Sequence, residues 1–133
     1  MRVRVRDRVN AYRIDAGFTP LRLQPALNAA AAAQARDMTR RGQRSHIGVD
    51  GASPPDRARA AGYNGVVLGE SLAETYAADL ATLDAWMAQT DTRAVLLDER
   101  GRDLGFAYFQ DENSKIWWVL VIGADDDGGV RPG

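Results

Sequence analysis

The stretch His46–Leu72, which reads HIGVDGASPPDRARAAGYNGVVLGESL, contains the features that decide the fold of this chain. Near its end, Glu70 lies in an apolar setting and directly follows a glycine. An ionised carboxylate in such a setting is costly unless another group pairs with it. The surroundings of Glu70 therefore decide whether the chain carries a metal site, an acid/base site or neither.

The middle of this stretch predicts a short helix. Ser53-Pro54-Pro55-Asp56 has the pattern of a capping box with prolines in the first helical turn, and Gly62 is placed to end the helix. Residues 64–71 follow as a predicted loop or short strand that carries Glu70.

A long helix is predicted upstream, from Pro25 to Arg41. Proline suits the first helical position, alanine has the highest helix propensity, and Gly42 is placed as a stop. One face of this helix would carry Leu27, Ala30, Ala31, Gln34 and Met38. We therefore expect Gln34 to point inward or toward a cleft.

The first residues fit two patterns. Arginines alternate with other residues over 2–8, which is compatible with a strand. Val5, Val9, Tyr12 and Ala16 form the longer stripe of an amphipathic helix that ends at Gly17, and we favour this helix. The arginines are then expected to form a solvated face rather than a binding patch.

Downstream of Glu70, two further helices are predicted. The spacing of Tyr76, Leu80, Leu83 and Met87 indicates a helix for which Thr75 is a plausible N-cap. A short helix is expected over residues 93–97.

The period then changes to two, which predicts an antiparallel hairpin of residues 104–109 and 116–122. The second strand is almost wholly apolar, so we expect it to be central and covered on both faces. Trp117 and Trp118 must then face opposite sides. At least one should be buried, and the other is a candidate to line a groove for an apolar ligand. Residues 124–133 have no apolar anchor and are expected to form a mobile acidic tail.

Composition limits the function classes. The chain has 133 residues, 17 basic and 18 acidic side chains and a net charge of −1, which fits one soluble domain. This balance gives no reason to expect nucleic acid or an anionic membrane as a partner. The absence of cysteine excludes disulfides, thiolate nucleophiles and cysteine-bound metals. No apolar run has transmembrane length, and MRVRVRDRV lacks the apolar core of a signal peptide, so we expect any export leader to be missing from this chain.

From about residue 9 to residue 123, the chain resembles the CAP superfamily, also called SCP-like domains, and in particular its compact bacterial branch. The similar segments occur in the family's order, and their order and spacing are more specific than any one of them. They are Val9-Asn10-Ala11-Tyr12-Arg13, Gly17-Phe18-Thr19-Pro20-Leu21, Leu27 with Ala35-Arg36-Asp37-Met38, Ser45-His46, Asp50-Gly51, Asp56-Arg57, Gly62-Tyr63, Gly69-Glu70-Ser71-Leu72, Trp86-Met87, Arg93, Leu96-Leu97, Trp117 and Gly123.

The resemblance implies an α+β fold, a three-layer α-β-α sandwich with a small and mainly antiparallel sheet. It implies one CAP/SCP-like domain over residues 1–123, with the tail 124–133 outside it. Family members are mostly secreted, so the resemblance also implies an extracellular or cell-envelope location.

Many family members have a cleft with two histidines and two acidic residues that can hold zinc. Carried over to this chain, those positions hold Gln34, Glu70, Gln89 and Thr92. Amides and hydroxyls are poor zinc ligands, so we expect no metal and no cofactor here. Gln34, Gln89 and Thr92 are good hydrogen-bond donors, so Glu70 is either held ionised by them or protonated.

His46 is the only histidine. It is either an anchor of its own loop or the partner of Glu70 in a weak candidate catalytic dyad. Ser45 and Ser71 do not lie in a Gly-x-Ser-x-Gly elbow, which argues against a serine hydrolase. The predicted cleft residues are thus Gln34, His46, Glu70, Gln89 and Thr92.

These observations favour a non-enzymatic binding domain with a degenerate metal cleft. Its partner would be a small molecule, a lipid or a cell-envelope ligand. A carrier of lipids or small apolar ligands is the alternative, followed by a hydrolase that uses Glu70 and His46.

Overall fold

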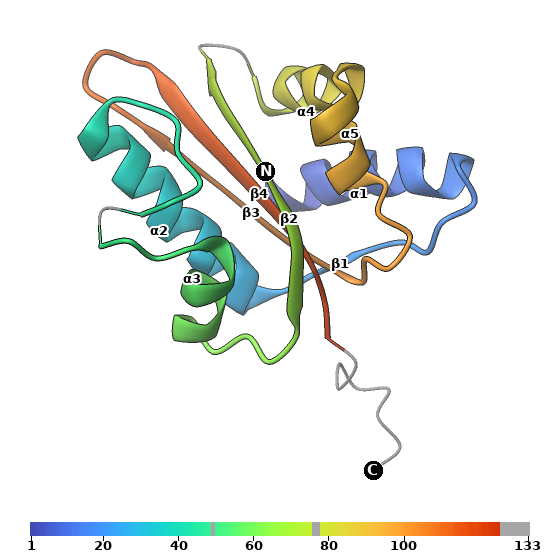
Figure 1. Cartoon of the computed structure of the whole chain (residues 1–133). Helices are drawn as coiled ribbons and strands as arrows, with labels where there is room; N and C mark the ends of the chain where they lie inside the picture. Colours follow the sequence, from blue (N-terminus) through green and yellow to red (C-terminus); the bar gives the residue numbers. More distant parts are fainter. Residues whose placement is uncertain (49, 76–77, 126–133) are drawn as a thin grey trace.

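The computed structural model describes residues 1–48, 50–75 and 78–125. Its helices are α1 (Arg2–Asp15), α2 (Pro25–Arg41), α3 (Pro54–Ala60), α4 (Asp79–Ala88) and α5 (Thr90–Leu96). Its strands are β1 (Arg22–Leu23), β2 (Val66–Thr75), β3 (Asp103–Gln110) and β4 (Ile116–Ala124). The sheet has the order β1-β3-β4-β2, with α2 and α3 on one face and α1, α4 and α5 on the other (Figure 1). The predicted three-layer α-β-α sandwich is confirmed.

The sheet is mainly antiparallel, as predicted. β4 pairs with both β3 and β2 in antiparallel register, which makes β4 central and β2 an outer strand. The short β1 pairs in parallel with the start of β3 and was not predicted, because two residues carry no periodicity. Ala124 still belongs to β4, one residue beyond the predicted domain end, and residues 126–133 lie outside the described part.

Both tryptophans of β4 are buried, on opposite faces of the sheet. Trp117 packs in the core beneath α2, and Trp118 packs in the core beneath α1 and α4, where its ring stacks on Phe106. Each is only 1% exposed. Neither tryptophan therefore lines the groove for which one of them was a candidate, because helices cover both faces of β4.

The structure confirms the predicted buried face of α2. All five residues on that face are buried, including Gln34, and Gly42 ends the helix in the left-handed conformation with φ 70°. A Cβ on Gly105 of β3 would collide with the backbone of Leu27, so strand and helix backbones nearly touch. The small alanines of α2 make this approach possible.

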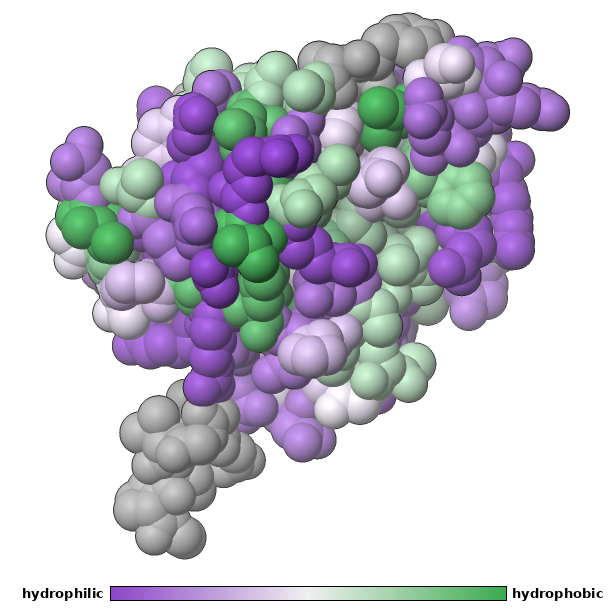
Figure 2. All heavy atoms as spheres, turned by 180° about the vertical axis from the view of Figure 1, so that it is seen from behind, coloured by the Kyte–Doolittle hydropathy of each residue, from purple (hydrophilic) through white to green (hydrophobic). Residues whose placement is uncertain are grey.

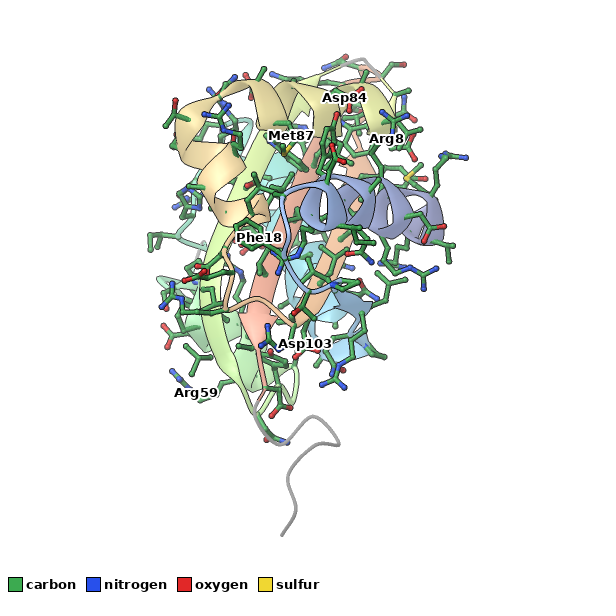
Figure 3. All side chains as sticks on the ribbon, turned by 90° about the vertical axis from the view of Figure 1, so that its right-hand side faces the viewer. Arg8, Phe18, Arg59, Asp84, Met87 and Asp103 are labelled. Atoms are coloured by element: carbon green, nitrogen blue, oxygen red, sulfur yellow. The ribbon has the colours of Figure 1, made fainter. Side chains whose placement is uncertain are left out.

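The predicted α1 helix is confirmed, and it buries Val5 and Val9, whereas Ala16 is exposed. Its arginines at positions 2, 4, 6 and 8 are exposed or half-buried but not simply solvated, whereas Arg13 is fully buried. Arg4 pairs with Asp79, and Arg8 pairs with Asp84. Both pairs join α1 to α4, and Figure 3 shows the second of them. These ion pairs fasten the N-terminal helix to the α4 layer.

Three boundaries near the site differ from the prediction. β2 extends through Thr75, and α4 begins at Asp79 with Ala78 as its N-cap, so Thr75 is not a cap. Tyr76 lies outside the described residues. α5 begins at Thr90, earlier than predicted. The length of β2 comes from its pairing with β4 over its whole extent, which the mixed sequence of β2 does not reveal.

No helix in the described part is both long and apolar enough to span a membrane. The face opposite to that of Figure 1 shows apolar side chains in small groups separated by polar ones (Figure 2).

Candidate binding pocket at Glu70

A pocket of about 760 Å³ lies along the outer strand of the sheet. One wall is the segment 42–46 that follows α2, and the floor is β2 with Glu70, Leu72 and Glu74. The other wall comes from the end of α4 and from α5. The volume is in the range of small-molecule sites. The edge of β2 thus brings together three segments that are distant in the sequence.

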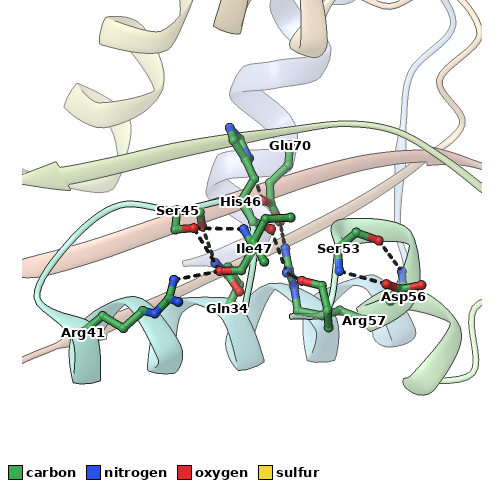
Figure 4. A network of polar contacts seen from close by, with 10 residues as sticks. Gln34, Arg41, Ser45, His46, Ile47, Ser53, Asp56, Arg57 and Glu70 are labelled. Atoms are coloured by element: carbon green, nitrogen blue, oxygen red, sulfur yellow. Dashed lines mark hydrogen bonds and ion pairs between the residues drawn. The ribbon is translucent and has the colours of Figure 1, made fainter. Parts of the chain in front are cut away.

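Glu70 is the most buried acid in this pocket, with a side chain that is 2% exposed. Its Oε1 accepts a hydrogen bond from His46 Nδ1 at 2.9 Å, and its Oε2 accepts one from Arg57 Nη2 at 2.6 Å (Figure 4). The expectation that Gln34, Gln89 and Thr92 hold this carboxylate is wrong. A buried carboxylate is stabilised most by a full countercharge, and Arg57 supplies it.

Arg57 is the functional residue that sequence reasoning missed. Its side chain is 6% exposed, and its Nη1 donates to the backbone oxygens of His46 and Ala52 at 2.9 and 3.0 Å. One guanidinium therefore joins α3, β2 and the His46 loop. The one signal in the sequence was the need of Glu70 for a positive charge, which does not by itself single out Arg57.

The local sequence explains why Arg57 faces β2. Asp56 N–H donates to Ser53 Oγ, and Ser53 N–H donates to Asp56 Oδ2, which confirms the predicted capping box. This box fixes the first residues of α3, so that Arg57 lies in the first turn on the buried side of the helix.

His46 contacts Glu70 but remains open to the pocket, with 57% of its side chain exposed. The hydrogen bond to Glu70 raises the pKa of His46, while partial burial and the charge of Arg57 oppose the rise. Because Arg57 holds Glu70 as a carboxylate, Nδ1 of His46 carries the hydrogen. Nε2 is then left as an acceptor in the neutral ring and a donor in the protonated ring.

The other predicted site residues lie in the pocket walls or directly behind them. Gln34 is buried behind the pocket, and its Nε2 donates to the backbone oxygen of Ser45, so it supports the His46 loop. Thr92 Oγ1 donates to the backbone oxygen of Trp86 at 2.6 Å and so joins α5 to α4. Gln89 is exposed and lines the pocket.

The residues at Glu70 do not fit a zinc ion. A catalytic zinc site uses three protein ligands, and the third neighbour here is a guanidinium. Among the described residues, no group of three or more His, Cys, Asp or Glu side chains is placed to hold a metal.

A serine nucleophile is not placed for catalysis either. Ser45 Oγ donates to the oxygen of Ile47 and accepts from its nitrogen, and Ser71 is fully buried.

A family model described as the cysteine-rich secretory protein family, CAP, matches residues 6–122. The structure is similar to an outer surface protein of Borrelia burgdorferi, with a TM-score of 0.81, 15% identity and coverage of 92% of this chain and 90% of that chain. It is also similar to an extracellular protein of Bacillus anthracis that contains an SCP domain, with a TM-score of 0.83 and 19% identity; 92% of this chain matches 39% of that one. A cysteine-rich secretory protein of Staphylococcus aureus has a TM-score of 0.65 and 16% identity, with coverage of 92% and 38%. The search of curated proteins found no match.

Proposed function

Because this chain belongs to the cysteine-rich secretory protein (CAP) family, we propose that it is a non-enzymatic binding domain of the extracellular space or cell envelope. Its binding site would be the pocket at Glu70, occupied by a small polar ligand and no metal. The location is supported by two solved relatives, which are named an outer surface protein and an extracellular protein.

The Arg57–Glu70 ion pair is the observation that carries this proposal. Both oxygens of the carboxylate already accept hydrogen bonds, and the nearer donor is a full positive charge at 2.6 Å. A divalent cation on Glu70 would lie close to this guanidinium in a poorly solvated place, where like charges repel strongly. The cleft is therefore proposed to be a former metal site that Arg57 neutralises.

The pocket lining favours a polar ligand over a lipid. Arg44, His46, Gln89 and Asp91 all line it, and they offer donors and acceptors on both walls. The tryptophans that were candidates for an apolar groove are buried in the core instead.

One observation favours the hydrolase as a second candidate, namely the 2.9 Å contact between His46 Nδ1 and Glu70. This contact would orient Nε2 as a general base toward a water molecule. Turnover of peptide or ester substrates that disappears in His46→Asn would support hydrolysis, and equal background rates in both proteins would exclude it.

The binding proposal is tested by a fragment screen with the ¹⁵N-labelled chain. We expect small polar fragments to shift the amide signals of Ser45, Gln89 and Thr92 in a saturable way. Shifts confined to the opposite side of the sheet, around Tyr108, would contradict the proposal, and so would the absence of any saturable shift.

A further inference from the structure

The charges that remain unpaired in the pocket are separated between its two walls. Glu70 is neutralised by Arg57, and Glu74 is paired with Lys115 at 3.3 Å. These two acids therefore contribute little net charge to a ligand. What remains is Arg44 on one wall, beside His46 whose Nδ1 contacts Glu70, and Asp91 on the other wall.

Arg44 and Asp91 are both exposed, and neither side chain makes a hydrogen bond or ion pair to any residue that the structure describes. In Figure 1 the segment after α2, which carries Arg44, lies on one side of β2, and α5, which carries Asp91, lies on the other. The pocket therefore has a positive side and a negative side.

The surface between these two sides is apolar. Leu72 on β2 and Val95 on α5 are both half-buried and both line the pocket. Val95 is held in place against Gly69, where any larger residue would collide with it. An aliphatic group of a ligand would find a contact surface there.

We propose that the pocket takes a short peptide with free ends. Its carboxylate would lie at Arg44 and His46, its ammonium group at Asp91, and an aliphatic side chain on Leu72 and Val95. This inference rests on the proposed binding function and names the class of ligand.

His46 makes this binding dependent on pH. Its ring contacts Glu70 from β2 through Nδ1, the charge of Arg57 from α3 acts on it, and Arg44 lies on the same loop. The protonated ring presents Nε2–H to the peptide carboxylate, whereas the neutral ring presents a lone pair that repels it. The affinity should therefore rise as the pH falls through the titration of His46.

The test uses the dipeptide alanyl-leucine and its two blocked forms, N-acetylated and C-amidated, with the His46 ring signal and calorimetry as readouts. Each blocked form should bind about threefold more weakly, as expected for one exposed charge pair. Asp91→Asn should bind the free and the N-acetylated dipeptide with equal affinity. Arg44→Gln should bind the free and the C-amidated dipeptide with equal affinity.

The matched controls are Arg36→Gln and Asp15→Asn, which change exposed charges outside the pocket. Both should retain the wild-type discrimination. Equal binding of the free and blocked dipeptides would overturn the inference, as would discrimination that survives in both pocket variants. If polar fragments bind the pocket but the dipeptide does not, only this inference fails. If no fragment binds there, the proposed function fails as well.

Discussion

Arg57 Nη2 lies 2.6 Å from Glu70 Oε2, and the two side chains are only 6% and 2% exposed. The same guanidinium binds the backbone oxygen of His46, so it fixes both the acid and the loop that covers it. The positive partner of the buried carboxylate is thus part of the chain itself. This relationship explains how an ionised acid is tolerated at the edge of the sheet without a metal.

Removal of Arg57 should destabilise the fold strongly. Arg57→Met leaves Glu70 as a buried charge without its countercharge, which typically costs about 3–5 kcal/mol. The free energy of unfolding from urea denaturation checks this value.

The matched control for this change is Arg59→Met, because Arg59 lies on the same short helix and is 70% exposed in its pair with Asp56. Its expected cost is below about 1 kcal/mol. In the double variant Arg57→Met/Glu70→Leu, much of the lost stability should return. Equal stability of the two single variants would show that the buried pair contributes nothing.

The single histidine gives a direct probe of the pocket. The hydrogen bond to Glu70 raises the pKa of His46 above its ordinary value of 6.5. An NMR titration of the one ring signal should therefore have its midpoint above that of a free histidine, and Glu70→Gln should lower the midpoint. An unchanged midpoint in Glu70→Gln would contradict the contact.

Stability should depend on pH through the same group. Because the folded-state pKa of His46 is raised, its contribution is fully present below the ordinary value of 6.5 and is lost as pH rises through the folded-state value. The stability difference between wild type and His46→Asn should thus be larger at about pH 5.5 than at about pH 8.5. Since the ring is more than half exposed, the change should stay below about 1 kcal/mol. The opposite trend in paired denaturation curves would exclude this interpretation.

The close approach of α2 and β3 predicts a sharp effect at Gly105. The added methyl group of Gly105→Ala would collide with the backbone of Leu27, and such overpacking typically costs about 1–3 kcal/mol. Gly42→Ala has no neighbour within 4 Å and should lose only about 1 kcal/mol through its positive φ. Thermal unfolding of both variants separates the effect of the collision from the effect of the positive φ. A smaller loss of stability at Gly105 than at Gly42 would refute the packing argument.

The lower end of the sheet depends on a second buried acid. Asp103 is fully buried and accepts hydrogen bonds from Tyr63 Oη and Arg22 Nε, each at 2.7 Å. Tyr63→Phe removes one of these donors and should cost about 1–3 kcal/mol. Tyr12→Phe removes a more exposed hydroxyl, bonded to Asp84, and should cost less. A denaturation midpoint that is unchanged in Tyr63→Phe would show that Arg22 suffices.

The sequence predicted the helices well where burial follows a regular period. The buried position of Gln34 followed from the stripe of α2, and the start of α3 followed from Ser53 and Asp56. The length of β2 was not predictable in this way, because it depends on pairing with β4.

The partners of Glu70 were harder to predict than the fold. Gln89 and Thr92 were chosen from family positions, yet Thr92 bonds to Trp86 and neither residue reaches the acid. Arg57 is one of 17 basic residues, and its sequence neighbours do not distinguish a buried guanidinium from a solvated one. Only the packing of α3 against β2 makes that distinction.

Calorimetric titration of the chain with zinc tests the central claim most directly. If Arg57 is the positive partner of Glu70, wild type should show no saturable zinc binding, and Glu70→Gln should behave in the same way. Stoichiometric and tight zinc binding by wild type that disappears in Glu70→Gln would contradict the account.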